Sequence, residues 1–251
     1  MSKRNMNAIM NPGLTSKEIS SRKVLVDWMC DVGDRYTLPA ESIHKAVFYY
    51  DKIIAENYLK DNEIKPIALI CMLLAVKLTE DDRVVNNIAS LFRKTIGSHK
   101  LNIMQYEIQV MRQLNWDLQH VTTIDFIKSF IVQGVVFSSD IAVNEKSVRS
   151  LRQYAEFFAD MCLQECEFIS VDSLVLAAGI IAAARKILAF QKIWNKELEE
   201  LVAVKREDAE KYAELILYKY GTLFPKNNHN KAVSSSLKSN TTTQHSLKRY
   251  I

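Results

Sequence analysis

Residues 67–76 read Ile-Ala-Leu-Ile-Cys-Met-Leu-Leu-Ala-Val, and residues 174–184 read Leu-Val-Leu-Ala-Ala-Gly-Ile-Ile-Ala-Ala-Ala. Both runs are apolar throughout, and both are shorter than the roughly 18 residues that span a bilayer. Such a run favours a helix that is enclosed by other helices. When Met72 is set against Gly179 and Ala75 against Ala182, the runs lie 107 residues apart. This offset is too long for a solenoid repeat of roughly 20–50 residues and indicates two duplicated domains.

Around each apolar run the sequence shows helical periodicity rather than strand-like alternation. Thr15-Ser16-Lys17-Glu18 has capping-box spacing and predicts a short N-terminal helix. Five helices are predicted in each half of the chain, at 22–36, 39–58, 62–78, 84–93 and 100–114, then at 123–133, 145–163, 172–188, 194–202 and 205–220. Gly221 and Pro225 follow the last helix in the usual order for a helix end. The predicted fold class is therefore all-α, with two tandem five-helix domains and a short N-terminal helix.

The composition excludes several classes of protein. Glycine and proline are scarce, with 6 and 4 residues in 251, and all-β folds need both in their many turns. Six scattered glycines leave no Gly-rich loop for a nucleotide phosphate. The four cysteines, Cys30, Cys71, Cys162 and Cys166, form no C-x-x-C pair and have no accompanying histidine cluster. We therefore expect reduced thiols, no metal site and no cofactor.

The chain has a net charge of +4, and its basic excess lies at the two ends. Residues 1–17 hold three basic residues and no acid, and residues 226–251 hold five and no acid, which leaves 18–225 net negative. An acidic body argues against nucleic-acid binding. Runs of Ser and Thr in 226–251 are typical of disorder. We predict an N-terminal arm (1–17), a first domain (18–120), a second domain (121–225) and a disordered basic tail (226–251).

Four stretches of the sequence resemble a known family. They read Ser-Arg-Lys-Val-Leu-Val-Asp-Trp at 21–28, Asp-Val-Gly at 31–33, Leu-Ile-Cys-Met-Leu-Leu-Ala-Val-Lys at 69–77 and Leu-Asn-Trp-Asp-Leu at 114–118. In this order and spacing they closely resemble the cyclin box. They are most similar to the A/B mitotic cyclins, whose first helix reads M-R-x-I-L-V-D-W. The resemblance covers about residues 18–220 and implies two tandem cyclin-box domains.

The resemblance also implies a function. Cyclins are regulatory subunits rather than enzymes, and they bind and activate a cyclin-dependent protein kinase, as a heterodimer, to control cell-cycle progression. The first box contacts the kinase helix that carries the active-site Glu, and kinase activity needs that Glu paired with the ATP-positioning Lys. The resemblance implies a location in the nucleus and cytoplasm. We expect neither nucleic acid nor membrane among the partners.

Two positions match the kinase-contacting residues of the family, Lys77 and Glu107. Lys77 follows a long apolar run, so its ammonium must emerge at a helix end, where it can bond the backbone carbonyls of a partner. Glu107, on a neighbouring helix, can accept from the same partner or orient Lys77. The alternative is an internal Lys77–Glu107 ion pair with no partner.

The resemblance places two further features on the first helix and the start of the third. Arg22 and Asp27 match a pair that braces the box internally. A shallow groove that captures basic-hydrophobic docking peptides of substrates or inhibitors is implied for Ser21, Leu25, Trp28, Asp31, Ile64 and Lys65. Ser21 stands where the family has Met, and Lys65 stands where Gln is usual. We therefore expect weaker binding of basic peptides than in typical A/B cyclins.

Two other classes of function compete with this interpretation. General transcription initiation factors also contain two tandem cyclin-type domains, usually with a zinc ribbon and a basic DNA-facing body. This chain shows no zinc ribbon, and residues 18–225 are acidic overall. An enzyme in its own right would need a nucleophile, a phosphate loop or paired acids, and the sequence shows none of these patterns.

Overall fold

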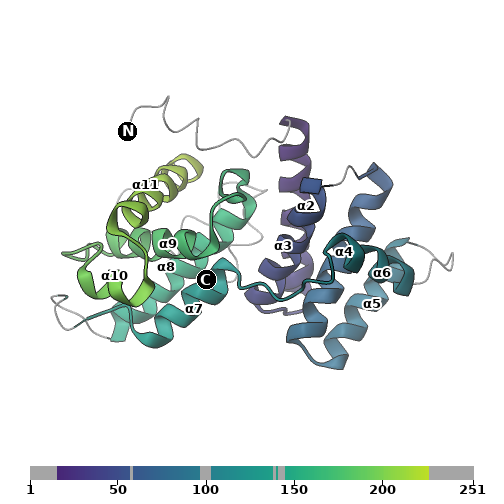
Figure 1. Cartoon of the computed structure of the whole chain (residues 1–251), viewed down its shortest axis with the longest axis horizontal. Coiled ribbons are helices and arrows are strands. Elements are labelled where there is room, and N and C mark those ends of the chain that lie inside the picture. The colour runs from purple at the N-terminus through teal and green to yellow at the C-terminus, as the bar shows by residue number, and fades with distance from the viewer. Residues whose placement is uncertain (1–15, 57–58, 97–102, 138–139, 141–144, 226–251) are drawn as a thin grey trace. The chain divides into compact units, whose positions relative to one another are not determined.

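A computed structural model describes residues 16–56, 59–96, 103–137, 140 and 145–225 (Figure 1). In this part of the chain the backbone forms helices and connecting turns, without strands. The chain divides into two compact units, one comprising residues 15–122 and the other including the residues from 123 onward. The predicted all-α class with two tandem domains is confirmed. Residues 1–15 of the predicted arm and the whole predicted tail lie outside the described residues.

Helix α4 (Asp61–Thr79) forms the centre of the N-terminal unit. It packs against each of the other helices described in this unit: α2 (Ser16–Arg35), α3 (Ala40–Glu56), α5 (Asp82–Ile96) and α6 (Ile103–Gln113). Every residue from Pro66 to Val76 is buried, as the apolar run predicts. Burying each large apolar side chain stabilises the fold by roughly 1.5–3 kcal/mol, so this helix is the core around which the others assemble.

Helix α9 (Ser173–Ile187) has the corresponding central position in the second unit. It contacts α7 (Thr123–Gln133), α8 (Glu145–Gln164) and α11 (Arg206–Leu223), and the unit also contains the 3-10 helix η1 (Cys166–Phe168) and α10 (Lys196–Val202). A Cβ added to Gly179 would lie 2.5 Å from the Cβ of Tyr212 on α11. Gly179 therefore lets α11 approach α9 more closely than a larger residue would allow.

Arg185, near the end of α9, is fully buried and fixes the surrounding loops. Its Nη2 and Nη1 donate to the carboxylate of Asp140 over 2.6 and 3.1 Å. Further bonds run to the backbone carbonyls of Val135 (2.8 Å), Lys192 (2.7 Å) and Ile193 (3.0 Å). A buried ion pair is tolerated where extra hydrogen bonds satisfy the remaining donors, and here the carbonyls serve that purpose.

Several helix ends differ from the sequence prediction, and two of these differences have a clear physical cause. The segment predicted as a short N-terminal helix continues into the first predicted helix, and both form α2 from Ser16 onward, because no Gly or Pro occurs between Ser16 and Gly33. Gly221 does not stop α11, which continues to Leu223. Glycine inside a helix costs only about 1 kcal/mol, whereas the residue before a proline disfavours the α conformation. Pro225 is therefore the stop signal, and the expectation for Gly221 was wrong.

The four cysteines are buried and unbridged. Burial raises the pKa of the Cys71 and Cys162 thiols, because the thiolate is poorly solvated there. Such thiols are inert and pack as small apolar groups. Among the described residues, no group of three or more His, Cys, Asp or Glu side chains is placed to hold a metal ion. None of the helices in this part of the chain has the length and apolar character needed to cross a bilayer.

Candidate functional site

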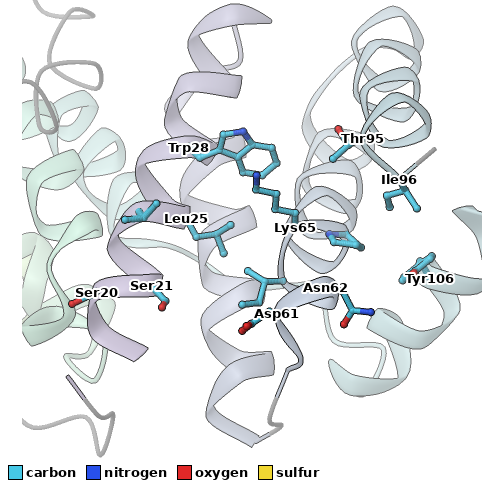
Figure 2. Close-up of a pocket in the computed structure, with 13 residues that line it drawn as sticks. Ser20, Ser21, Leu25, Trp28, Asp61, Asn62, Lys65, Thr95, Ile96 and Tyr106 are labelled. Carbon is cyan, nitrogen blue, oxygen red and sulfur yellow. The ribbon is translucent and has the colours of Figure 1, made fainter. Parts of the chain in front are cut away.

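A groove of about 950 Å³ opens between α2, the start of α4, the end of α5 and α6 (Figure 2). Residues Ser21, Leu25 and Trp28 of α2 line it because their spacing of four and three residues places them on one helical face. The other lining residues are Ser20, Val24, Asp61, Asn62, Ile64, Lys65, Pro66, Thr95, Ile96 and Tyr106. The lining combines apolar side chains with hydroxyls and two opposite charges, so the groove suits a segment that is part apolar and part polar.

Five of the six residues predicted for this groove line it, and Asp31 does not. Asp31 follows Trp28 by three residues, so it lies about one turn beyond the last α2 residue that lines the groove. Eight lining residues had not been predicted: Asp61, Asn62, Pro66, Ser20, Val24, Thr95, Ile96 and Tyr106. The helical spacing of Asp61 from Lys65 could have indicated the first of these. The last three come from α5 and α6, whose approach depends on tertiary packing.

Lys65 reaches across the groove from α4 to α2 (Figure 2). Its Nζ lies 5.9 Å from the centre of the Trp28 ring, within the range of a cation–π contact. Asp61 precedes Lys65 by one helical turn, a spacing that favours an acid–lysine ion pair. The ammonium nevertheless lies over the indole, which leaves Asp61 and Lys65 as two separate charges on the groove.

Arg22 fixes α2 to α3 through Asp51, a partner that the sequence had not indicated. Its Nε and Nη2 donate to the two carboxylate oxygens of Asp51, both over 2.7 Å. This two-bond geometry is the strong form of an arginine–carboxylate pair. The neighbouring Tyr50 has its pKa raised to about 12, mainly by burial and further by the negative charge of Asp51. The positive charge of Arg22 partly offsets this rise. Arg22 therefore has an internal bracing contact, while the predicted bracing role of Asp27 stays a prediction.

Lys77 and Glu107 form an ion pair at the end of α4, with Nζ 2.5 Å from Oε1. The Lys77 side chain remains 43% exposed, whereas that of Glu107 is 18% exposed. Leu78, the next residue on α4, and Met104, one turn before Glu107 on α6, are also exposed. Glu107 thus lies where it can orient Lys77, as both the contact role and the alternative of an internal ion pair expect, and the kinase-contacting role of the two residues stays a prediction. A half-exposed ammonium, held by one carboxylate and accompanied by apolar side chains, is suited to contact another protein.

The Leu-Asn-Trp-Asp-Leu stretch at 114–118 closes the first unit with a tight turn. Asn115 and Trp116 have positive φ angles of 53° and 59°. Tyr49 of α3 donates its hydroxyl to the carbonyl of Leu118 over 2.8 Å, and Lys45 donates to the carbonyl of His120 over 3.0 Å. These bonds satisfy carbonyls outside any helix, so α3 holds this segment in place.

Two models of one protein family match consecutive parts of this helical chain. The family model for the cyclin N-terminal domain matches residues 2–119, and the model for the cyclin C-terminal domain matches residues 121–248. The chain therefore belongs to the cyclin family.

Relatives within the family are distant in sequence. G1/S-specific cyclin-D1 of Xenopus laevis is 29% identical over 171 residues, covering 67% of this chain and 56% of the relative. Cyclin-A2-1 of Arabidopsis thaliana is 24% identical over 180 residues, covering 71% and 39%. Cyclin-J-like protein of Mus musculus is 22% identical over 215 residues, covering 80% and 56%. The chain spans about half the length of these relatives. Their names belong to several cyclin types, so they identify the family rather than a type within it.

Solved structures agree on the fold. A viral cyclin from herpesvirus saimiri superposes with a TM-score of 0.65 at 15% identity, over 82% of this chain and 86% of that one. A chain of the yeast RNA polymerase II CTD kinase CTDK-1 complex superposes with a TM-score of 0.65 at 14% identity, over 99% and 81%. At this level of identity the likeness concerns the arrangement of the helices.

Proposed function

We propose that this chain is a regulatory subunit that binds and activates a cyclin-dependent protein kinase and so controls cell-cycle progression. The observation that carries the proposal is the half-exposed Lys77–Glu107 pair at the end of the central helix of a cyclin N-terminal domain. The proposal gives the chain no catalytic role of its own. Its effect on the kinase is positional, because kinase activity requires an active-site Glu to be held against the ATP-positioning Lys.

The geometry of the pair suits this role. A lysine ammonium has three donors, and Glu107 accepts from Lys77 Nζ, so donors remain for the backbone carbonyls of a partner. Glu107 fixes the direction of the Lys77 side chain and reduces the entropy lost on binding. Leu78 and Met104 are 50% and 59% exposed, and their burial against the kinase would supply the apolar part of the interface.

The test is a binding titration with the kinase that co-purifies with the tagged full chain from its source cell. We expect Lys77→Ala or Glu107→Ala to weaken kinase binding by roughly 2–4 kcal/mol, because each leaves the other charge unpaired in the interface. Lys52→Ala is the matched control, since Lys52 forms an ion pair with Asp117 in the same unit at 3.7 Å. Wild-type affinity for Lys77→Ala would contradict the assigned interface.

Two finer points belong to the same proposal. The Leu-Val-Asp-Trp sequence at 25–28 supports assignment of the first box to the A/B type. The groove between α2 and α4 supports a second contact surface that captures docking segments of substrates or inhibitors. Phosphorylation of a substrate that carries a docking segment, compared with the same substrate lacking it, tests the second point. Equal rates for the two substrates would contradict it.

A further inference from the structure

The Trp28 end of the groove carries an ammonium with no carboxylate partner. Among the described residues, no acidic side chain forms an ion pair with Lys65, and its Nζ lies 5.9 Å from the centre of the Trp28 ring. Asp27 and Asp31, the acids closest to Trp28 along α2, do not line the groove. Arg93 and Lys94, in the last turn of α5 just before the lining residue Thr95, are exposed. The cations at this end are therefore Lys65 in the lining and the exposed Arg93 and Lys94 next to it along the chain.

The opposite end of the groove carries one negative charge. Asp61, at the start of α4, lines the groove one turn before Lys65. Rise along a helix places these two residues about 6 Å apart along its axis. Among the described residues that line the groove, Asp61 is the single acid and lies at one end, and Lys65 is the single cation and lies beside the indole.

The length of the groove suits an extended peptide. Ser21 and Trp28 both line it and lie seven residues apart on α2, which is about 10 Å along the axis. An extended chain covers that distance in about three residues. Alternate side chains of such a segment point the same way, so one can rest on Leu25 and Trp28 while its neighbours face the charged and hydroxyl groups.

We propose that the groove binds an extended segment of another protein in which an acidic residue, Asp or Glu, lies beside a large apolar side chain. The apolar side chain packs on Leu25 and Trp28, and the carboxylate accepts from Lys65. This inference rests on the proposed docking role of the groove and names the chemistry of the segment that docks. The proposed charge is opposite to the one expected for docking peptides of the family. The reason is that the ammonium of Lys65 lies over Trp28 and would repel a basic side chain of the peptide there.

The test uses the full chain without a kinase and three labelled ten-residue peptides with the same leucine–phenylalanine core. The core is flanked by glutamate, glutamine or lysine, and binding is followed by fluorescence anisotropy at low salt. We expect the glutamate peptide to bind about three- to tenfold more tightly than the lysine peptide, with glutamine between them. The difference shrinks as salt rises, because exposed charges are screened.

Lys65→Gln should bring the glutamate and lysine peptides within about twofold of each other and leave the glutamine peptide unchanged. Lys60→Gln is the matched control, because Lys60 is an exposed lysine directly before α4 that does not line the groove. The proposal is overturned if no peptide binds, if the lysine peptide binds as tightly as the glutamate peptide, or if Lys60→Gln abolishes the preference as fully as Lys65→Gln.

Failure of this proposal is separable from failure of the kinase-binding proposal. Peptide binding is measured with no kinase present, and kinase affinity depends on Lys77, twelve residues further along α4. Lys65→Gln should therefore leave kinase affinity unchanged while it removes the peptide preference.

Discussion

Replacing Gly179 by alanine should separate two central helices of the C-terminal unit. The added Cβ would lie 2.5 Å from the Cβ of Tyr212, 3.4 Å from its carbonyl carbon and 3.5 Å from the amide nitrogen of Ala213. Carbon atoms in contact normally lie about 3.5–4.0 Å apart, so α9 and α11 must move apart by about 1 Å. The obstacle is the backbone and Cβ of a helix, which cannot rotate aside as the end of a long side chain can.

The size of the effect follows from two opposing contributions. Overpacking a core typically costs about 1–3 kcal/mol, and the rigid neighbours of Gly179 place this substitution at the upper end. Alanine recovers about 1 kcal/mol relative to glycine through its higher helix propensity. The net loss is then about 2 kcal/mol in the free energy of unfolding, which lowers the melting temperature of a domain of this size by about 8–16 °C.

Gly221→Ala provides a matched control on α11 itself. A Cβ there meets nothing within 4 Å, so only the propensity gain remains, and we expect a stabilisation of about 0.5–1 kcal/mol. Urea unfolding of the full chain, followed by circular dichroism, measures both variants. The close-packing argument is refuted if Gly179→Ala is as stable as the wild type, or if both substitutions shift stability in the same direction.

Three further predictions concern other parts of the molecule. Arg185→Met should destabilise the C-terminal unit by about 3–5 kcal/mol in urea unfolding, because Asp140 is left buried without its partner; adding Asp140→Leu should restore part of the loss. Tyr50→Phe should reduce the loss of stability at alkaline pH, because the pKa of Tyr50 is raised from 10.0 to about 12 in the folded protein. The stabilisation that Tyr50 gives the wild type is therefore full below pH 10 and is lost as the pH rises to 12. Urea unfolding midpoints of both proteins at pH 9 and 11.5 measure the difference. Ser21→Met should strengthen binding of the glutamine-flanked peptide about three- to tenfold by extending the apolar wall, and unchanged anisotropy titrations would contradict this.

The core of the fold could be predicted because it depends on local pattern. The run at 67–76 has no polar residue, so any compact fold must bury it, and all ten residues are buried. The close approach of α11 at Gly179 likewise follows from a local property, the absence of a Cβ at that position. The groove was predicted through the resemblance to the cyclin box, and helical spacing explains why Ser21, Leu25 and Trp28 share one face of α2.

The partners of individual charges could not be predicted in the same way. Arg22 binds Asp51, 29 residues away, and Arg185 binds Asp140, 45 residues away. These pairings depend on how whole helices and loops pack, and many acids in the sequence could serve equally well. Lys65 shows the same limit, because its spacing from Asp61 favours a local pair while the structure places it over Trp28.

Both units are built around an apolar central helix. The residues of the second unit that correspond to Lys65 and Lys77, however, have different roles. With the 107-residue offset, Lys65 corresponds to Asp172, and Asp172 is occupied as the N-cap of α9, accepting from the amides of Leu174 and Val175 over 3.0 and 3.1 Å. Lys77 corresponds to Ala184, which is fully buried. Substitutions at 172 and 184 should therefore change stability alone, whereas those at 65 and 77 should change binding with little change in stability, because their ammonium groups lie at the surface of the N-terminal unit.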